Sequence, residues 1–253
     1  MSYDVFARYY DALTANVNYE EMADYLCALL KKEGHRAGLT LDLACGTGSL
    51  TLALARRGFD IYGVDSSMEM LSVAQEKASE EGMAILFLRQ RMQSLDLYGT
   101  VNTVFCSLDS INHLTGEEDV KKTFSRVALF LEPGGYFVFD MNTLYKHRYV
   151  LGNQSFLYDT EEVFCAWQNH FEEKTGRVSI SLDFFEKKGK LYERSSERFY
   201  ERAYPLEQVL TWLREADLEP RLVVESGTFH EPGQTTERVT IAARKLLQAG
   251  EGF

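Results

Sequence analysis

Two kinds of segment alternate along the chain between about residue 20 and about residue 140. Short runs of apolar, mostly branched side chains are separated by longer stretches whose apolar residues recur at helical spacing, most clearly over residues 67–81 and 117–130. This alternation predicts βαβ units and a parallel sheet that is covered by helices on both faces. The predicted strands cover residues 39–45, 59–64, 84–88, 101–107 and 136–139.

The pattern changes at about residue 146, where polar and aromatic residues begin to alternate without a helical period. Alternation of this kind, which continues to about residue 200, predicts half-exposed antiparallel strands. A helical period resumes over residues 206–216, and two further strands are predicted at residues 222–225 and 238–243.

These patterns predict one α/β domain with an insertion. We expect the domain to comprise residues 1–145 and 203–253, and residues 146–202 to form an inserted antiparallel β subdomain that covers the substrate site.

Composition places the chain among globular proteins with reduced thiols. Of its 253 residues, 45% are apolar, and the 4 cysteines form no Cys-x-x-Cys pair, so neither a zinc site nor a disulfide framework is indicated. A net charge of −11 argues against general nucleic-acid binding. No run reaches the roughly 18 apolar residues that span a bilayer, and no signal-peptide pattern is present, so we expect a cytoplasmic protein with no membrane partner.

The segment that carries chemistry is residues 41–50, where an apolar strand runs through two glycines directly into a helix. Gly46 and Gly48 suit a backbone that turns sharply and lets a ligand approach with no side chain in the way. Asp65 ends the next predicted strand, where a carboxylate can accept hydrogen bonds from both hydroxyls of a ribose. Together these residues predict a nucleoside site at the carboxyl ends of the strands.

A dinucleotide dehydrogenase also has a glycine-rich turn at this place, but two details count against one. Thr51 occupies the position of the third glycine in the dinucleotide pattern. Asp42 puts a negative charge inside the strand, which is poorly suited to a pyrophosphate and well suited to a cationic ligand. A packing turn that binds no ligand is the remaining alternative.

At this point the sequence resembles the class I S-adenosylmethionine-dependent methyltransferases, whose first motif is matched by Asp42, Gly46 and Gly48. It is most similar to a bacterial small-molecule subgroup. The matching segments are Phe-Ala-Arg-Tyr-Tyr-Asp-Ala-Leu at residues 6–13, Asp-Ser-Ile-Asn-His-Leu at residues 109–114 and Pro-Gly-Gly at residues 133–135. The resemblance implies a doubly wound, mostly parallel seven-stranded Rossmann-like sheet with an inserted antiparallel β subdomain, and S-adenosyl-L-methionine as cofactor.

The resemblance also implies roles for individual residues. The first motif would line the methionine moiety, Asp65 would hold the ribose, and Ser66 and Met70 would flank the adenine. Arg91 stands where the family usually has an acid that contacts adenine, so Met92 or Gln93 would serve instead through the backbone. The cofactor-binding residues predicted in this way are Asp42, Ala44, Cys45, Gly46, Thr47, Gly48, Asp65, Ser66, Met70, Met92, Gln93, Cys106 and Leu108.

Methyl transfer from a sulfonium is an in-line displacement that needs no metal and no covalent nucleophile, so the protein mainly aligns the acceptor and excludes water. The predicted catalytic residues are His113, Asn112 and Tyr10. His113 is a candidate general base, with closure of a helix end as the alternative, and Asn112 either orients the acceptor or caps the loop. Tyr10 would cover the site and favour the sulfonium through its aromatic face.

Three functions remain open from the sequence. The first is methyl transfer to a small-molecule acceptor by a monomer or homodimer, because the insertion is large enough to cover a pocket. The second is methylation of tRNA or rRNA, which requires a basic stripe beside the site. The third is noncatalytic binding of the nucleoside.

Overall fold

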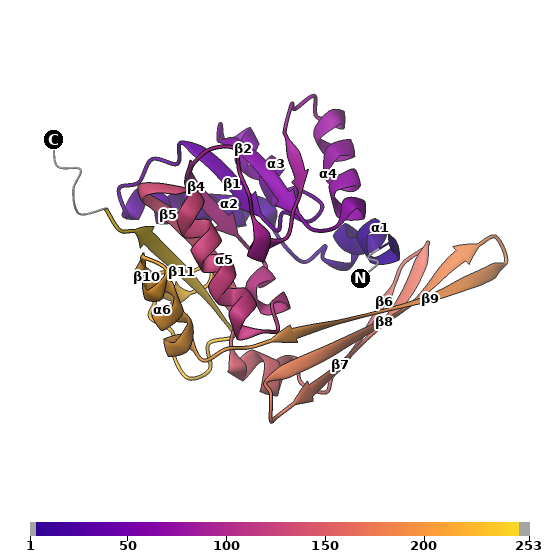
Figure 1. The fold of residues 1–253 in the computed structure, drawn as a ribbon. Coiled ribbons are helices and arrows are strands. Elements are labelled where there is room, and N and C mark those ends of the chain that lie inside the picture. The colour runs from indigo at the N-terminus through magenta and orange to yellow at the C-terminus, as the bar shows by residue number, and fades with distance from the viewer. Residues whose placement is uncertain (1–3, 248–253) are drawn as a thin grey trace.

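The computed structural model describes residues 4–247 and contains two sheets (Figure 1). The larger sheet has seven strands in the order β10-β11-β5-β4-β1-β2-β3. Only the pairs β10–β11 and β11–β5 are antiparallel, so the sheet is mostly parallel, as predicted. Its strands are β1 Leu39–Leu43, β2 Asp60–Asp65, β3 Phe87–Arg89, β4 Val101–Cys106, β5 Leu131–Asn142, β10 Leu218–Glu225 and β11 Arg238–Lys245.

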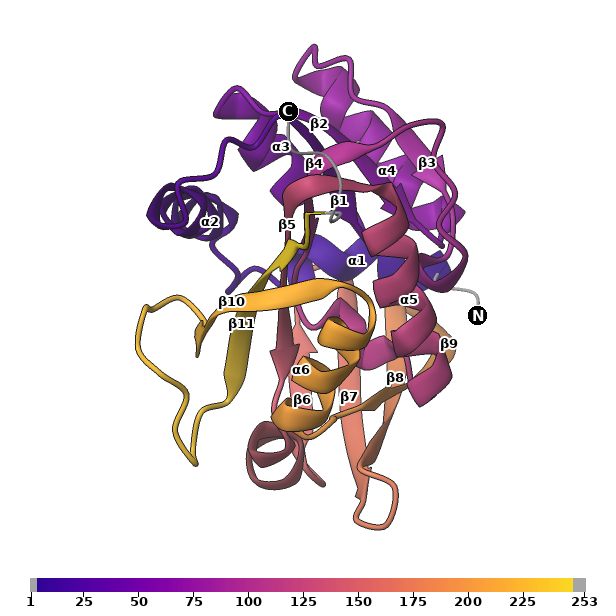
Figure 2. The same ribbon diagram turned by 60° about the vertical axis from the view of Figure 1, so that its left-hand side comes forward.

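Helices cover both faces of this sheet, which is why its strands are almost continuously apolar. Figure 2 shows α2 (Tyr19–Lys32) on one side and α5 (Glu117–Phe130) and α6 (Leu206–Glu215) on the other. The first side buries Leu29 against Phe105 and Val138, and the second packs Phe124 and Leu213 against the opposite face. The remaining main-sheet helices are α3 (Ser49–Arg56) and α4 (Met68–Glu80).

The second sheet has four antiparallel strands in the order β6-β7-β8-β9. They are β6 Ser155–Asp159, β7 Val163–Glu172, β8 Arg177–Lys188 and β9 Leu191–Arg202, so all four come from the segment predicted as an insertion. In β8 buried residues alternate with less buried ones, as expected of a sheet with one covered face. The domain boundaries at residues 145/146 and 202/203 stay a prediction.

The covered face of this sheet packs against α1 (Asp4–Leu13) rather than against the main sheet directly. Phe6 and Leu13 of α1 share a core with Ile180 and Phe184 of β8 and with Met70 of α4. Figure 1 accordingly shows α1 between α4 and the four-stranded sheet. The N-terminal helix therefore joins the two layers of the molecule.

Two element predictions need correction. Residues 146–151, which were expected to begin the antiparallel strands, form the helical turn η3 (Lys146–Leu151). Strand β5 is much longer than the predicted residues 136–139, because a register shift against β4 between Val101 and Thr103 lets the chain stay paired on both sides of the Pro-Gly-Gly segment. Pairing with β11 extends the strand at its other end and places Asp140 and Asn142 at the carboxyl edge of the sheet.

Candidate active site

The turn after β1 has a left-handed backbone at three alternate positions, Ala44, Gly46 and Gly48. The two glycines are needed for different reasons. A Cβ on Gly46 would meet nothing within 4 Å, so this glycine leaves open space beside the backbone. A Cβ on Gly48 would lie 2.8 Å from the Cβ of Ala74, so that glycine lets the turn pack closely on α4. The turn thus provides bare backbone at Gly46 for a ligand.

Asp65, the last residue of β2, ties this turn to the start of α4. Its Oδ2 accepts a hydrogen bond from the backbone N–H of Gly46 at 2.9 Å, and its Oδ1 accepts one from Ser67 at 2.9 Å. Burial raises the pKa of the Asp65 carboxyl, and these backbone N–H groups oppose the rise by favouring the charged form. The carboxylate is therefore fixed in position at the edge of the sheet.

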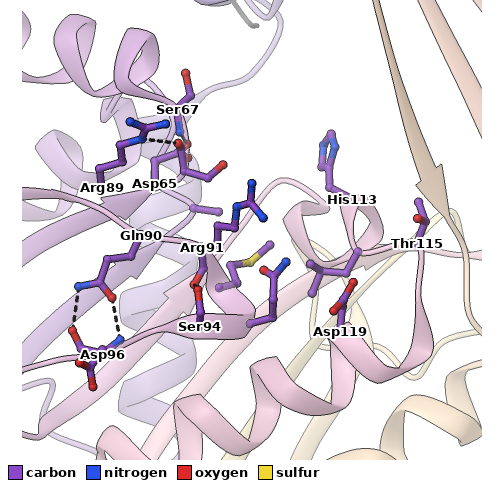
Figure 3. Close-up of a pocket in the computed structure, with 15 residues that line it drawn as sticks. Asp65, Ser67, Arg89, Gln90, Arg91, Ser94, Asp96, His113, Thr115 and Asp119 are labelled. Atoms are coloured by element: carbon purple, nitrogen blue, oxygen red, sulfur yellow. Dashed lines mark hydrogen bonds between the residues drawn. The ribbon is translucent and has the colours of Figure 1, made fainter. Parts of the chain in front are cut away.

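A cavity of about 830 Å³ opens beside Asp65 (Figure 3). Figure 3 shows Asp65, Ser67 and Arg89 at one end of it and His113 and Thr115 at the other. Its size suits a nucleoside-sized ligand. Six predicted site residues line it: Ala44, Asp65, Ser66, Met92, Gln93 and His113.

A smaller cavity of about 40 Å³ lies at the turn itself and is lined by Tyr10 of α1 together with Tyr19 and Ser107. Burial raises the pKa of Asp42, which also borders it, to about 7, and its Oδ2 accepts a hydrogen bond from the Thr51 hydroxyl. A cationic ligand beside this carboxyl favours its charged form. The other predicted site residues that line this cavity are Ala44, Cys45, Gly46, Thr47 and Leu108.

Three predicted cofactor residues line neither cavity. Gly48 caps α3, Met70 is buried in the core between α4 and α1, and Cys106 is fully buried with its Sγ 3.8 Å from the Sδ of Met92. Their contacts with the cofactor stay predictions, and their visible roles are in packing.

Helix α1 is fastened to the glycine turn by Asp11. Its Oδ1 accepts a hydrogen bond from the Thr47 hydroxyl at 2.7 Å, and its Oδ2 lies 2.7 Å from the Lys77 ammonium. Tyr10 is held over the smaller cavity as a result, and burial raises the pKa of its phenol well above the ordinary value. The covering role of Tyr10 stays a prediction.

The two candidates from the Asp-Ser-Ile-Asn-His-Leu segment have different surroundings in the short helix η2 (Ser110–His113). His113 borders the large cavity, and its Nε2 lies 3.8 Å from the Oε1 of Glu201. Asn112 is fully buried and bonds only to backbone: its Oδ1 accepts from Asn142 at 2.9 Å, and its Nδ2 donates to the carbonyls of Asn142 and Arg202. These contacts give Asn112 a structural role, and its role toward the acceptor stays a prediction.

The structure adds a group that sequence reasoning missed, at the end of β4. Leu108 and Asp109 have left-handed backbones, with φ of 56° and 51°. Their N–H groups donate to the Asp140 carboxylate at 2.9 and 2.6 Å, and Arg238 bridges Asp140 and Asp109 at 2.9 and 2.5 Å. We call Asp109, Asp140 and Arg238 the edge brace. It offsets the strain of two non-glycine left-handed residues beside the cofactor turn.

The edge brace shifts the pKa values of Asp109 and Arg238. Burial raises the pKa of Asp109, and the Arg238 guanidinium opposes that rise. The neighbouring Asp140 and Asp109 hold the pKa of Arg238 above its ordinary value although burial opposes this. No signal in the sequence links these residues, because they come from three different elements.

Comparison with known proteins identifies the family of the chain. The family model described as "Methyltransferase domain" matches residues 40–135. A protein of Geobacillus sp. (strain WCH70) that is named as a methyltransferase is 34% identical over 250 residues, which is 97% of this chain and 100% of the relative. An S-adenosylmethionine-dependent methyltransferase from Clostridium acetobutylicum ATCC 824 is 36% identical and superposes with a TM-score of 0.86 over 97% of this chain and 99% of that one.

A more distant structure shows the same fold with the cofactor bound. S-adenosylmethionine-bound CalS10, an amino pentose methyltransferase from Micromonospora echinaspora, is 18% identical, with a TM-score of 0.74 over 93% of this chain and 96% of that one. The predicted fold class and cofactor are confirmed, and the dehydrogenase alternative is excluded. The chain belongs to the S-adenosylmethionine-dependent methyltransferases.

Proposed function

We propose that this methyltransferase methylates an amine nitrogen of a small acceptor that binds beside His113 and the edge brace. The observation that carries the proposal is the excess of carboxylates there. Asp109, Asp140 and Glu201 are all largely buried near two cations, the guanidinium of Arg238 and the ammonium of Lys146, which leaves carboxylates in excess by one. A site with such an excess of negative charge favours a cationic or amine-bearing acceptor over an anionic one.

The residues present fit S-adenosylmethionine. Asp65 is placed to hold the ribose hydroxyls, the open backbone at Gly46 accommodates the methionine moiety, and the Asp42 carboxyl favours a positive charge nearby. When bound, the cofactor supplies a methyl group on a positively charged sulfur, and the acceptor nitrogen displaces that sulfur, which keeps the electron pair of the broken C–S bond.

His113 acts as the general base. An amine that arrives as an ammonium must lose a proton before its lone pair can form the new N–C bond, and the imidazole accepts that proton. The side chain of His113 is 36% exposed, so it can return the proton to solvent. Asp109 binds the ammonium form through the carboxylate that Arg238 holds in place.

Helix α1 excludes water from the reacting atoms. Tyr10 covers the smaller cavity, and the contact of Asp11 with Thr47 closes that side of the turn. Displacement at a methyl group depends mainly on alignment and dehydration, so this cover provides much of the rate enhancement.

CalS10 supports the choice of an amine-bearing acceptor only by analogy, since that protein is an amino pentose methyltransferase and shares the fold. The predicted alternatives, an RNA substrate and noncatalytic binding, are tested together with the proposal. The predicted monomeric or homodimeric state is tested on the same sample, and the predicted cytoplasmic location stays a prediction. Within residues 4–247 no helix is long and apolar enough to cross a membrane.

The deciding experiment is a turnover assay with methyl-labelled S-adenosylmethionine against three panels: primary and secondary amines, matched hydroxyl compounds, and total tRNA. Label in amine products at rates well above the hydroxyl panel supports the proposal. Label only in hydroxyl products contradicts the nitrogen assignment, and label in tRNA supports the RNA alternative. Binding without any turnover in the three panels supports the noncatalytic alternative. Light scattering of the same sample gives the oligomeric state.

A further inference from the structure

Glu201 lies at the end of β9, where the four-stranded sheet meets the active site. Its side chain is 7% exposed, and each of its carboxylate oxygens faces a different histidine. Oε1 lies 3.8 Å from the Nε2 of His113, and Oε2 lies 3.2 Å from the Nε2 of His147. A carboxylate from the insertion thus stands between a cavity histidine and a second histidine of the helical turn η3.

His147 has no evident role in the apolar packing around it. It is fully buried, and the carboxylate of Glu201 is the only acidic group within 4 Å of its ring among the residues the structure describes. Neither ring nitrogen makes a hydrogen bond within the described chain, so Nε2 meets Glu201 only as a close charged contact at 3.2 Å. Burial of an imidazole without hydrogen bonds costs free energy, and a facing carboxylate offsets part of that cost when the ring is charged. The contact with Glu201 therefore accounts best for a histidine at this buried position.

The charges around Glu201 keep it ionised despite its burial. The neighbouring His147 and the charge of His113 lower the pKa of Glu201, and Arg238 of β11 acts in the same direction, against the effect of burial. Asp109, at the start of η2, is the like-charged group that faces it. A charged carboxylate beside a base stabilises the cation that forms when the base takes up a proton.

We propose that Glu201 is a positioning residue for His113, and that His147 anchors Glu201 from behind. We call the three residues the relay. With its Nε2 turned toward Glu201, His113 presents Nδ1 as the nitrogen that accepts the proton of the acceptor amine. The carboxylate then faces the imidazolium that has formed. This inference rests on the proposed role of His113, and it assigns a function to the end of the inserted sheet.

The relay has a test that needs neither cofactor nor acceptor. In the full chain labelled with ¹³C-glutamate, the Glu201 carboxyl signal is assigned by its loss in Glu201→Gln and then titrated by NMR. We expect the pKa of Glu201 to rise in His147→Gln and also in His113→Gln, because each variant removes a group that favours the charged form. His230→Gln, which changes an exposed histidine, is the control and leaves the titration unchanged.

An unchanged titration of Glu201 in both His147→Gln and His113→Gln would overturn the relay. This outcome is independent of the proposed function. The relay can be present in an enzyme that methylates hydroxyl groups, and it can be absent in one that methylates amines.

A second measurement tests whether the relay acts in catalysis, and it uses the acceptor that the turnover panels identify. Glu201→Gln is expected to lower kcat about tenfold or more, to leave calorimetric S-adenosylmethionine affinity unchanged, and to alter the pH profile of kcat. Glu201→Asp recovers part of the loss, since it keeps the charge. The matched control is Asp183→Asn, a carboxylate that pairs with Arg194 on the neighbouring strand.

Two results would contradict the positioning role. One is an equal loss of kcat in Glu201→Gln and Asp183→Asn. The other is a loss in Glu201→Gln with an unaltered pH profile, which indicates a fall in the share of folded enzyme and no effect on the base.

Discussion

Replacement of Asp65 by alanine tests the cofactor site most directly. The wild-type carboxylate accepts backbone hydrogen bonds from Gly46 and Ser67, both at 2.9 Å, and it borders the large cavity. The variant leaves both N–H groups without their acceptor and removes the predicted ribose ligand. Hydrogen bonds to a charged group contribute about 1.5–3 kcal/mol each, so both stability and affinity are expected to fall.

The two effects can be estimated separately. Loss of the ribose contacts is expected to weaken binding of S-adenosylhomocysteine at least about tenfold, since about 1.4 kcal/mol corresponds to that factor. Water can reach the freed N–H groups through the cavity, so we expect a stability loss of only about 1–3 kcal/mol. For a chain of this size each kcal/mol lowers Tm by roughly 2–4 °C.

Titration calorimetry with S-adenosylhomocysteine measures the affinity, and thermal unfolding without ligand measures the stability. The control is Asp60→Ala, since Asp60 is an exposed carboxylate at the opposite end of β2. Affinity within twofold of wild type in a folded Asp65→Ala protein would refute the ribose assignment. A tenfold loss in both variants would show that the charge of the strand, and no specific contact, determines affinity.

Three further outcomes are expected. Burial raises the pKa of Asp42 to about 7, so its carboxyl is neutral below that pH and charged above it. In calorimetry, the affinity for S-adenosylmethionine should therefore fall as the pH falls through about 7. The Asp42→Asn variant should lose this pH dependence. Arg238→Leu removes the cation that bridges the two carboxylates of the edge brace. In urea unfolding, the free energy of unfolding should fall by about 3–5 kcal/mol. An unchanged midpoint would contradict the brace. Gly48→Ala should destabilise the protein more than Gly34→Ala. Both positions are left-handed, but only a Cβ on Gly48 would collide with another side chain, that of Ala74. Equal losses of unfolding free energy would contradict the packing argument.

The parts of the fold that sequence predicted are those with a local signal. Buried parallel strands are apolar along their whole length, and a turn that must expose backbone uses glycine, so β1, β2 and the Gly46 turn could be located from pattern alone. The length of β5 could not, because Pro133 and its two glycines indicate a break, and only the register shift against β4 keeps the strand paired.

The edge brace and the relay could not be predicted for a different reason. Arg238 is 98 residues from Asp140 and 129 from Asp109, and no periodicity connects them. Glu201 ends an alternating strand in which charged residues ordinarily face solvent, so nothing marked it as buried. His113 and Tyr10 were found only because the segments around them match a family. Polar groups that meet through tertiary structure leave no trace in a single sequence.

The inserted sheet does more than cover a pocket, because it contacts the site at two separate points. Its Glu186 lies 2.5 Å from Arg8 of α1, and its Glu197 accepts the N–H groups of Val5 and Phe6, so the sheet holds the helix that carries Tyr10. At the other point its Glu201 faces His113, the proposed base. A rigid sheet cannot shift at one contact without strain at the other. Under the proposed function, the position of Tyr10 over the smaller cavity and the position of the base are therefore mechanically linked.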